Sequence, residues 1–296
     1  VVSTILWPKS SRKYMRFGIC PLSVAPLRTA PSHKSEMASQ LLFGELVEIM
    51  ERKGRQWLKV RCIHDNFVSW ADSNQIKEVT PSEFTSIQGH FAFGLELVQA
   101  AMGHNHFIPI TIGARLPNFD GLNFKLGEMQ FTYSGQAIAS NELKQEPTFL
   151  LKMAKRYLNA PFVWGGRSPF GIDSSGFVQV LFAMIGHQLP RDPAAQIELG
   201  SNIDFVEQAQ AGDLAFFENK NGRIFHVGLI MEEQAIIHAH GRVRIDRLDH
   251  YGIYNEETKK YTHKLRLCKR ILPNLPAKDA SSMPQKAVFD NQVELF

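Results

Sequence analysis

The hydrophobic pattern of the chain changes about halfway along its 296 residues. From Phe17 to about Val79, short stretches alternate apolar and polar residues, and the turn sequence at 52–55 separates two of them. This alternation is typical of β-strands with one buried face, and short, evenly spaced strands predict a small barrel at 17–80. From about Pro81 to Ile138 the pattern again indicates strands, separated by Asp-Gly and proline turns.

The second half predicts helices packed on a sheet. One helix is expected over 148–157, and a second begins near Ser174, with Phe177, Leu181 and Met184 on one face. After Gly212 the pattern indicates strands at 214–217, 226–231, 235–239, 242–245 and 265–271. Helices on an antiparallel sheet predict an α+β domain over 146–272. Residues 1–16 are expected to be an extension, and 273–296 a partly disordered tail.

Composition narrows the class of protein. Hydrophobic content of 44% and charged content of 21% are ordinary for a globular chain, and the net charge of +4 comes with no basic run that would indicate nucleic acid. No stretch approaches the roughly 20 apolar residues of a membrane span. Three scattered cysteines form no metal or disulfide pattern and are expected to be buried free thiols.

The N-terminal residues are relevant to the cellular compartment in which the protein is located. The first 14 residues contain no apolar segment of the length a signal peptide needs, and the folded pattern begins near Met15. We therefore expect a cytoplasmic protein, although a periplasmic or secreted one stays open. A monomer is expected.

One segment carries the candidate chemistry. The sequence at 161–166 is Pro-Phe-Val-Trp-Gly-Gly, and that at 171–177, Gly-Ile-Asp-Ser-Ser-Gly-Phe, opens the second helix. His226 and His238 follow on predicted strands. A nucleophile at a helix N-terminus with two later histidines is the layout of a papain-like peptidase. Taken alone, Asp173-Ser174-Ser175 is also an ordinary helix cap.

A metal site is the weaker alternative. His238 and His240 would share a strand face, as a metal-binding pair does, but no carboxylate or cysteine falls at ligand spacing. We therefore expect no metal and no cofactor.

These motifs resemble the NlpC family of cell-wall peptidases over roughly Phe149 to Leu272. In that family the helix opens Asp-Cys-Ser-Gly-Phe, and the Trp-Gly-Gly turn, the Leu-Pro-Arg-Asp at 189–192, Gln196 and the segment 212–217 match as well. The upstream half resembles the paired bacterial SH3-like domains of γ-D-glutamyl-L-diamino-acid endopeptidases. The resemblance implies two small SH3-like β-barrels, the second at 81–140, followed by a papain-like α+β peptidase domain.

The resemblance also implies roles for single residues. Position 174 would carry the nucleophile, His226 would be its base and His238 would orient His226. The substrate would be a peptidoglycan stem peptide with a free N-terminal L-Ala, cut between γ-D-Glu and a diamino acid. Its binding residues would be Asp173, Ser175, Glu36, Trp70, Arg191, Phe162 and Trp164. Asp173 and Glu36 would hold the amine, and Ser175 and Arg191 the D-Glu carboxylate.

Two departures from the family put activity in doubt. Ser174 stands where the family has cysteine, and Phe162 where it has a tyrosine that donates to the oxyanion. A helix dipole contributes only ~0.3–1 kcal/mol, too little to ionise a serine hydroxyl. Three interpretations stay open: an engineered or inactivated cysteine peptidase, a natural non-catalytic muropeptide or cell-wall binder, and a working serine enzyme. We expect the chain as written to be inactive. A pure SH3-like adaptor would not need His226 and His238.

Overall fold

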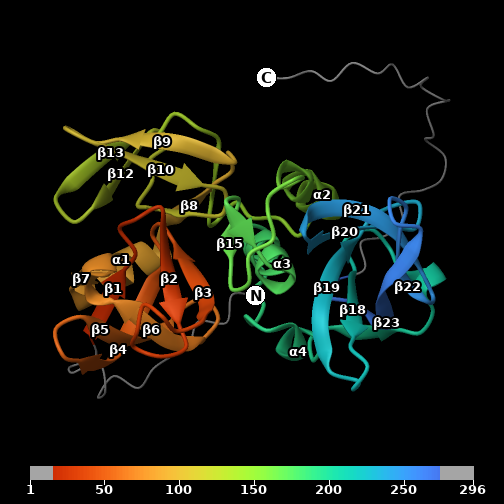
Figure 1. The fold of residues 1–296 in the computed structure, drawn as a ribbon. Coiled ribbons are helices and arrows are strands. Elements are labelled where there is room, and N and C mark those ends of the chain that lie inside the picture. The colour runs from red at the N-terminus through yellow and green to blue at the C-terminus, as the bar shows by residue number, and fades with distance from the viewer. Residues whose placement is uncertain (1–15, 274–296) are drawn as a thin grey trace.

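The computed structural model describes residues 16–273 and consists of three parts around one helix (Figure 1). Two β-rich parts lie on one side of helix α3 (Ser174–Ala183), and a large sheet lies on the other. Nearly all of the predicted extension and tail falls outside the described residues. No helix within 16–273 is long and apolar enough to cross a membrane.

The first part is a barrel-like sheet of seven strands in the order β3-β2-β6-β5-β4-β1-β7. Its interior is filled by alternate apolar residues such as Leu27, Val47 and Val60. The prediction of short alternating strands over this region is confirmed. The strands are β1 (Arg16–Ile19), β2 (Val24–Arg28), β3 (Met37–Leu42), β4 (Leu46–Lys53), β5 (Trp57–Cys62), β6 (Val68–Asp72) and β7 (Lys77–Val79).

The second part opens with a helix that the strand pattern did not predict. Helix α1 (Pro81–Gly89) replaces the strand expected from residue 81. Its start is a capping box, in which Thr80 N donates to Glu83 Oε2 at 2.8 Å and Glu83 N donates to Thr80 Oγ1 at 3.2 Å. The predicted strands follow in two small sheets, β10-β9-β13-β12 and β11-β8-β14. Their bounds are β8 (Phe91–Gly94), β9 (Val98–Met102), β10 (Phe107–Thr111), β11 (Arg115–Pro117), β12 (Asn123–Leu126), β13 (Met129–Thr132) and β14 (Ala137–Ala139).

The third part has the predicted α+β architecture. Helices α2 (Pro147–Arg156) and α3 precede an antiparallel sheet in the order β17-β23-β18-β19-β20-β21-β22, in which β22 also pairs with β23. The sequence pattern missed β17, β22, the short helix α4 (Pro193–Gln196) and the pair β15 (Arg167–Ser168) and β16 (Gly171–Ile172). The large sheet consists of β17 (Ser201–Ile203), β18 (Leu214–Glu218), β19 (Ile224–Ile230), β20 (Ala235–His240), β21 (Arg242–Asp249), β22 (Gly252–Asn255) and β23 (Lys260–Arg270).

Helix α3 is buried on every side, whereas the sequence pattern predicted one apolar face. Residues 174–182 are all buried, because α2, α4 and β15 pack on α3 beside the large sheet, and the two β-rich parts contact it as well. At Gly113, whose φ is +81°, a Cβ atom would lie 2.4 Å from Val180 Cγ1 of α3. One hydrophobic core therefore runs from the barrels through α3 into the sheet.

A buried ion pair joins the first barrel to the third part. Arg167 Nη1 and Nη2 donate to the two carboxylate oxygens of Glu45 at 2.6 and 2.9 Å, and Arg167 Nη1 also donates to the Gln40 carbonyl at 2.7 Å. Burial alone would raise the pKa of Glu45, but the adjacent Arg167 charge outweighs it and lowers the pKa to about 2. The pair therefore holds the two domains together as long as Glu45 is ionised.

We expect Glu45→Gln to destabilise the protein by ~3–5 kcal/mol, because it leaves the Arg167 charge buried without its partner. Urea unfolding measures the loss, with exposed Glu51→Gln as the matched control. The folded-state pKa of Glu45 lies below its usual 4.5, so its stabilisation is complete above that pH and is lost as the pH falls toward about 2. Equal stability of the two variants would contradict the assignment.

Candidate active site

The start of helix α3 is fixed by Asp173. Its Oδ1 accepts the Gly176 N–H at 2.7 Å, which caps the helix, and its Oδ2 accepts the Gly165 N–H at 2.9 Å. Gly165 has a φ of +78°, and a Cβ atom there would lie 2.3 Å from the Met37 carbonyl oxygen of the first barrel. The Trp-Gly-Gly motif is therefore a turn that allows the barrel backbone to approach the helix start.

Arg191 completes this arrangement. Its Nη1 donates to Asp173 Oδ1 at 3.0 Å and to Ser175 Oγ at 2.8 Å, its Nη2 donates to Asp173 Oδ2, and its Nε donates to Ser39 Oγ of the first barrel at 3.0 Å. Arg191 forms its ion pair with Asp173 at the start of α3 and not with its sequence neighbour Asp192.

These bonds bear on the predicted substrate contacts. Asp173 is only 7% exposed and accepts five hydrogen bonds, including a 3.2 Å bond from Ser175 Oγ. The carboxylate expected to hold a substrate amine and the guanidinium expected to hold the D-Glu carboxylate therefore bind each other. Their binding roles stay predictions, and their structural role is to position residue 174.

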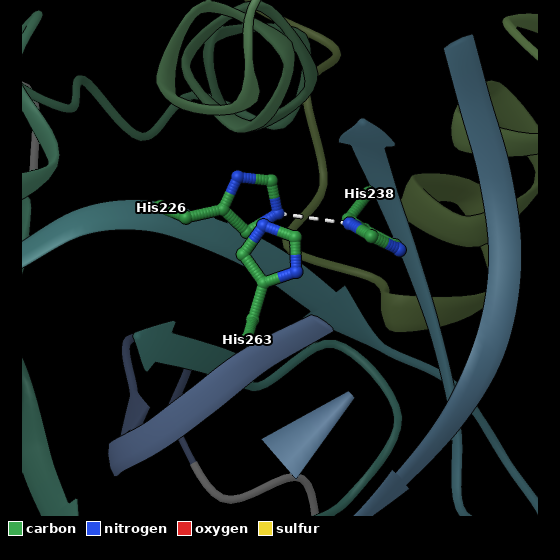
Figure 2. Close-up of side chains that lie close together, drawn as sticks. All are labelled: His226, His238 and His263. Atoms are coloured by element: carbon green, nitrogen blue, oxygen red, sulfur yellow. Dashed lines mark hydrogen bonds between the residues drawn. The ribbon is translucent and has the colours of Figure 1, made fainter. Parts of the chain in front are cut away.

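The two predicted histidines lie in hydrogen-bond contact. His226 on β19 and His238 on β20 are joined by a 2.8 Å bond between Nε2 and Nδ1 (Figure 2). His238 Nε2 lies 3.0 Å from Asp246 Oδ2 on β21, and Arg244 donates to both oxygens of Asp246 at 2.7 and 2.9 Å. The line His226–His238–Asp246 orients the His226 ring, as the acidic member of a catalytic triad does.

Ser174 is the first residue of α3, and this helix packs against β19, which carries His226. The nitrogen of His226 that does not bond His238 points toward the helix drawn end-on above it, in the green of α3 (Figure 2). Within residues 16–273, no hydrogen bond joins Ser174 Oγ to His226 or His238. The Ser174–His226 contact of the predicted triad therefore stays a prediction.

The electrostatics favour neutral histidines. Burial lowers the pKa of His226 well below its usual value, and the nearby His263 and His238 lower it further. Burial also lowers the pKa of His238, against the opposing effect of Asp246. His226 is thus unprotonated at neutral pH, which is the charge state that a general base requires.

Three of the remaining predicted residues lie near the Trp-Gly-Gly turn and the start of α3, and the fourth, Trp70, lies within the first barrel. Trp164 is 60% exposed, and its Nε1 donates to Glu36 Oε1 of the first barrel, so Glu36 does reach the Trp-Gly-Gly turn. Phe162 is half-exposed, and its backbone forms a β-bridge with Ile172, two residues before Ser174. Trp70 lies on β6, paired with Arg28 and beneath Lys59, so its described contacts are within the first barrel.

Sequence reasoning missed three residues near the histidines: Arg244, Asp246 and His263. Asp246 lies just past the predicted strand 242–245, and an alternating pattern continued to 249 would have placed it on the His238 side of the sheet. His263 stacks on His226, with ring centroids 4.1 Å apart. No sequence pattern pointed to His263, because β23 begins at Lys260, five residues before the start of the strand predicted at 265–271.

Comparison with known proteins agrees with this architecture. Residues 159–265 match the NlpC/P60 family and residues 27–76 the bacterial dipeptidyl-peptidase Sh3 domain. The fold and site thus define an α+β domain of the peptidase class joined to a barrel-like SH3 domain. The chain carries an NlpC/P60 family hydrolase domain preceded by a bacterial dipeptidyl-peptidase SH3 domain, and the predicted family and fold class are confirmed.

Individual relatives are similar over most of the chain. The gamma-D-glutamyl-L-lysine dipeptidyl-peptidase of Bacillus subtilis (strain 168) is 26% identical over 215 residues, which cover 68% of this chain and 71% of that protein. Dipeptidyl-peptidase 6 of Lysinibacillus sphaericus is 24% identical over 79% of this chain and 93% of its own. The crystal structure of an NlpC/P60 family protein from Bacillus cereus ATCC 10987 shares the fold, with a TM-score of 0.75 at 20% identity over 87% of this chain and all of that one.

Replacing Ser174 with cysteine should create one reactive thiol. A thiol at the start of α3 gains from the helix dipole and a neutral His226, whereas burial raises the pKa of Cys20 and of Cys268 to about 12 and that of Cys62 well above its usual value. We expect iodoacetamide to modify Ser174→Cys rapidly at one site and the parent chain only slowly, as measured by intact mass spectrometry. His226→Gln in the cysteine background should slow the reaction. A Ser174→Cys chain no more reactive than the parent would refute this geometry.

Proposed function

We propose that this chain acts on peptidoglycan stem peptides that have a free N-terminal L-Ala, at the bond between γ-D-Glu and the diamino acid. The observation that carries the proposal is the His226–His238–Asp246 line beside the helix that begins at residue 174. With Ser174 at the nucleophile position, we expect the chain to bind these peptides and to hydrolyse them very slowly.

The SH3 domain supports this choice of substrate. It contributes Ser39 to the bonds around Asp173, and Glu36 to the exposed Trp164 at the rim. A wall on one side of the nucleophile limits the length of peptide on that side, as a dipeptidyl-peptidase requires. The relatives named as dipeptidyl-peptidases match 68% and 79% of the chain, which is more than its peptidase domain alone.

The reaction would follow the cysteine-peptidase route if residue 174 carried a thiol. His226 would take the thiol proton, and the thiolate would add to the γ-carbonyl carbon of D-Glu. The backbone N–H of residue 174 would hold the oxyanion. His226 would then protonate the leaving amine, and water would release the dipeptide from the thioester. A serine hydroxyl is far less acidic, and the dipole and a neutral His226 activate it poorly.

A non-catalytic muropeptide or cell-wall binding protein is the second candidate. Two positions favour it together: Ser174 lacks the thiol, and Phe162, beside Ile172 at the helix start, lacks the hydroxyl of the family's tyrosine. Loss of one oxyanion donor alone costs about 10²–10³ in rate. The rest of the site would then serve recognition only.

Hydrolysis separates the two candidates. We expect little or no cleavage of L-Ala-γ-D-Glu-L-Lys by the parent, measurable cleavage by Ser174→Cys, and a further rise of up to ~10²–10³ with Phe162→Tyr added. Product release is measured by mass spectrometry, and His226→Gln in the double variant is the inactive control. Full activity in the parent would make Ser174 a competent nucleophile. A Ser174→Cys chain that binds but never cleaves would establish the binding protein.

Recognition of the free amine can be tested separately. We expect calorimetry to show binding of L-Ala-γ-D-Glu-L-Lys and much weaker binding after its amine is acetylated, because acetylation removes the charge that Glu36 would accept. Glu36→Gln should reduce this difference, whereas exposed Glu51→Gln should preserve it. Equal affinity for the free and acetylated peptides would show that the site does not recognise the free amine.

A further inference from the structure

A third imidazole joins the histidine pair of the site. His263 on β23 stacks on His226, and the tip of its ring lies toward the His226–His238 hydrogen bond (Figure 2). One ring nitrogen from each of the three side chains lies within 4.8 Å of the other two. All three side chains are buried. The His238–His240 pair, which the sequence offered only as a weaker alternative, is a different arrangement, with ring centroids 6.3 Å apart.

The ring spacing suits a single bound ion. Imidazoles on one tetrahedral ion with Zn–N bonds of roughly 2.0–2.1 Å have ring centres about 5 Å apart. The centroid distances are 4.1 Å for His226–His263, 5.0 Å for His226–His238 and 5.6 Å for His238–His263. They bracket the expected value, so small ring rotations would bring the three nitrogens to one ion.

Hydrogen bonds to neighbouring side chains orient two of the three imidazole rings so that each can present a nitrogen lone pair to a metal ion. The Asp246 carboxylate accepts from Nε2 of His238 and so leaves the lone pair on Nδ1, which faces the cluster. In zinc sites, a carboxylate usually accepts a hydrogen bond from the second ring nitrogen of a ligating histidine. His263 Nδ1 lies 2.9 Å from Thr262 Oγ1, and no hydrogen bond within residues 16–273 uses its Nε2.

The charge state also fits. Burial, together with the nearby His238 and His240, lowers the pKa of His263 to about 3, and the pKa values of His226 and His238 are lowered as well. Three neutral imidazoles keep their lone pairs available at neutral pH, and imidazole nitrogen suits Zn²⁺ and its neighbours in the first transition row. The hydrogen bond between His226 and His238 is the interaction that an ion would displace.

We propose that His226, His238 and His263 form a binding site for Zn²⁺ or a similar divalent transition-metal ion, and that the bound ion prevents His226 from acting as a base. A metal on Nε2 of His226 leaves the ring proton on Nδ1, so this nitrogen no longer accepts a proton from residue 174. The inhibitory consequence rests on the proposed function, whereas the binding site itself does not.

Binding is tested on the parent chain with any affinity tag removed. Serine at 174 supplies no thiolate ligand, so bound metal reports the histidines. We expect calorimetry to show one tightly bound Zn²⁺ per chain, and Co²⁺ to give the strong visible absorption of a tetrahedral site. His263→Phe retains a stacked ring but removes the ligand nitrogen, and Asp246→Asn alters only the outer contact. His104→Ala, in an exposed loop, is the matched control.

The expected ranking distinguishes the site from surface binding. Asp246→Asn should weaken Zn²⁺ binding by ~10–100-fold, His263→Phe by more than that, and His104→Ala not at all. Circular dichroism checks that each variant is folded. A parent chain that takes up no Zn²⁺, or a folded His263→Phe that binds it as tightly as the parent, would overturn the proposal.

Inhibition of peptide cleavage by the bound ion is tested in a separate experiment. In the Ser174→Cys chain, Zn²⁺ should stop cleavage of L-Ala-γ-D-Glu-L-Lys, and His263→Phe in that background should relieve the inhibition. Inhibition that persists with His263→Phe would place the ion on the new thiol and refute this step. If the Ser174→Cys chain proves inactive, only the proposed hydrolysis fails, because Zn²⁺ binding is measured on the parent.

Discussion

The buried pair of Asp173 and Arg191 is the interaction on which the site depends. Asp173 caps α3, holds the Gly165 turn and accepts two bonds from Arg191, which in turn donates to Ser39 of the first barrel. Two buried charges are costly to desolvate, and only a nearly complete set of hydrogen bonds offsets that cost. Asp173 accepts five such bonds, so the helix start, the Trp-Gly-Gly turn and the SH3 domain are fixed relative to one another.

The large sheet supplies the second group of side chains in the site, which contains two histidines and the carboxylate that orients them. His226, His238 and Asp246 lie on three consecutive strands, so their spacing follows from strand separation rather than from any loop. Arg244 holds Asp246 from the outside, so the carboxylate is positioned before any substrate arrives. This rigid support would serve a base that must keep one ring orientation.

The surrounding structure remains that of a peptidase although the nucleophile position holds serine. The Arg167–Glu45 pair, the continuous core around α3 and the glycine at 165 all place the barrel against the helix start. The same close approach buries Ser174 and leaves Trp164 and Phe162 at the surface. Two exposed aromatic side chains therefore lie close in sequence to the buried Ser174.

The sequence by itself determined the strands of the first barrel, the helix at α3 and the two histidines, because alternation, helical periodicity and motif order are local properties. It also contained the capping box at Thr80 and Glu83, which the strand pattern concealed. Only the tertiary structure paired Arg191 with Asp173, Arg167 with Glu45 and His263 with His226. Each of these pairs joins segments that are separated in the sequence, and no local pattern records which buried charge or ring will face which. The burial of α3 on all sides was likewise decided by the tertiary structure, because α2, α4 and the two β-rich parts pack on faces that the helix alone would leave to solvent.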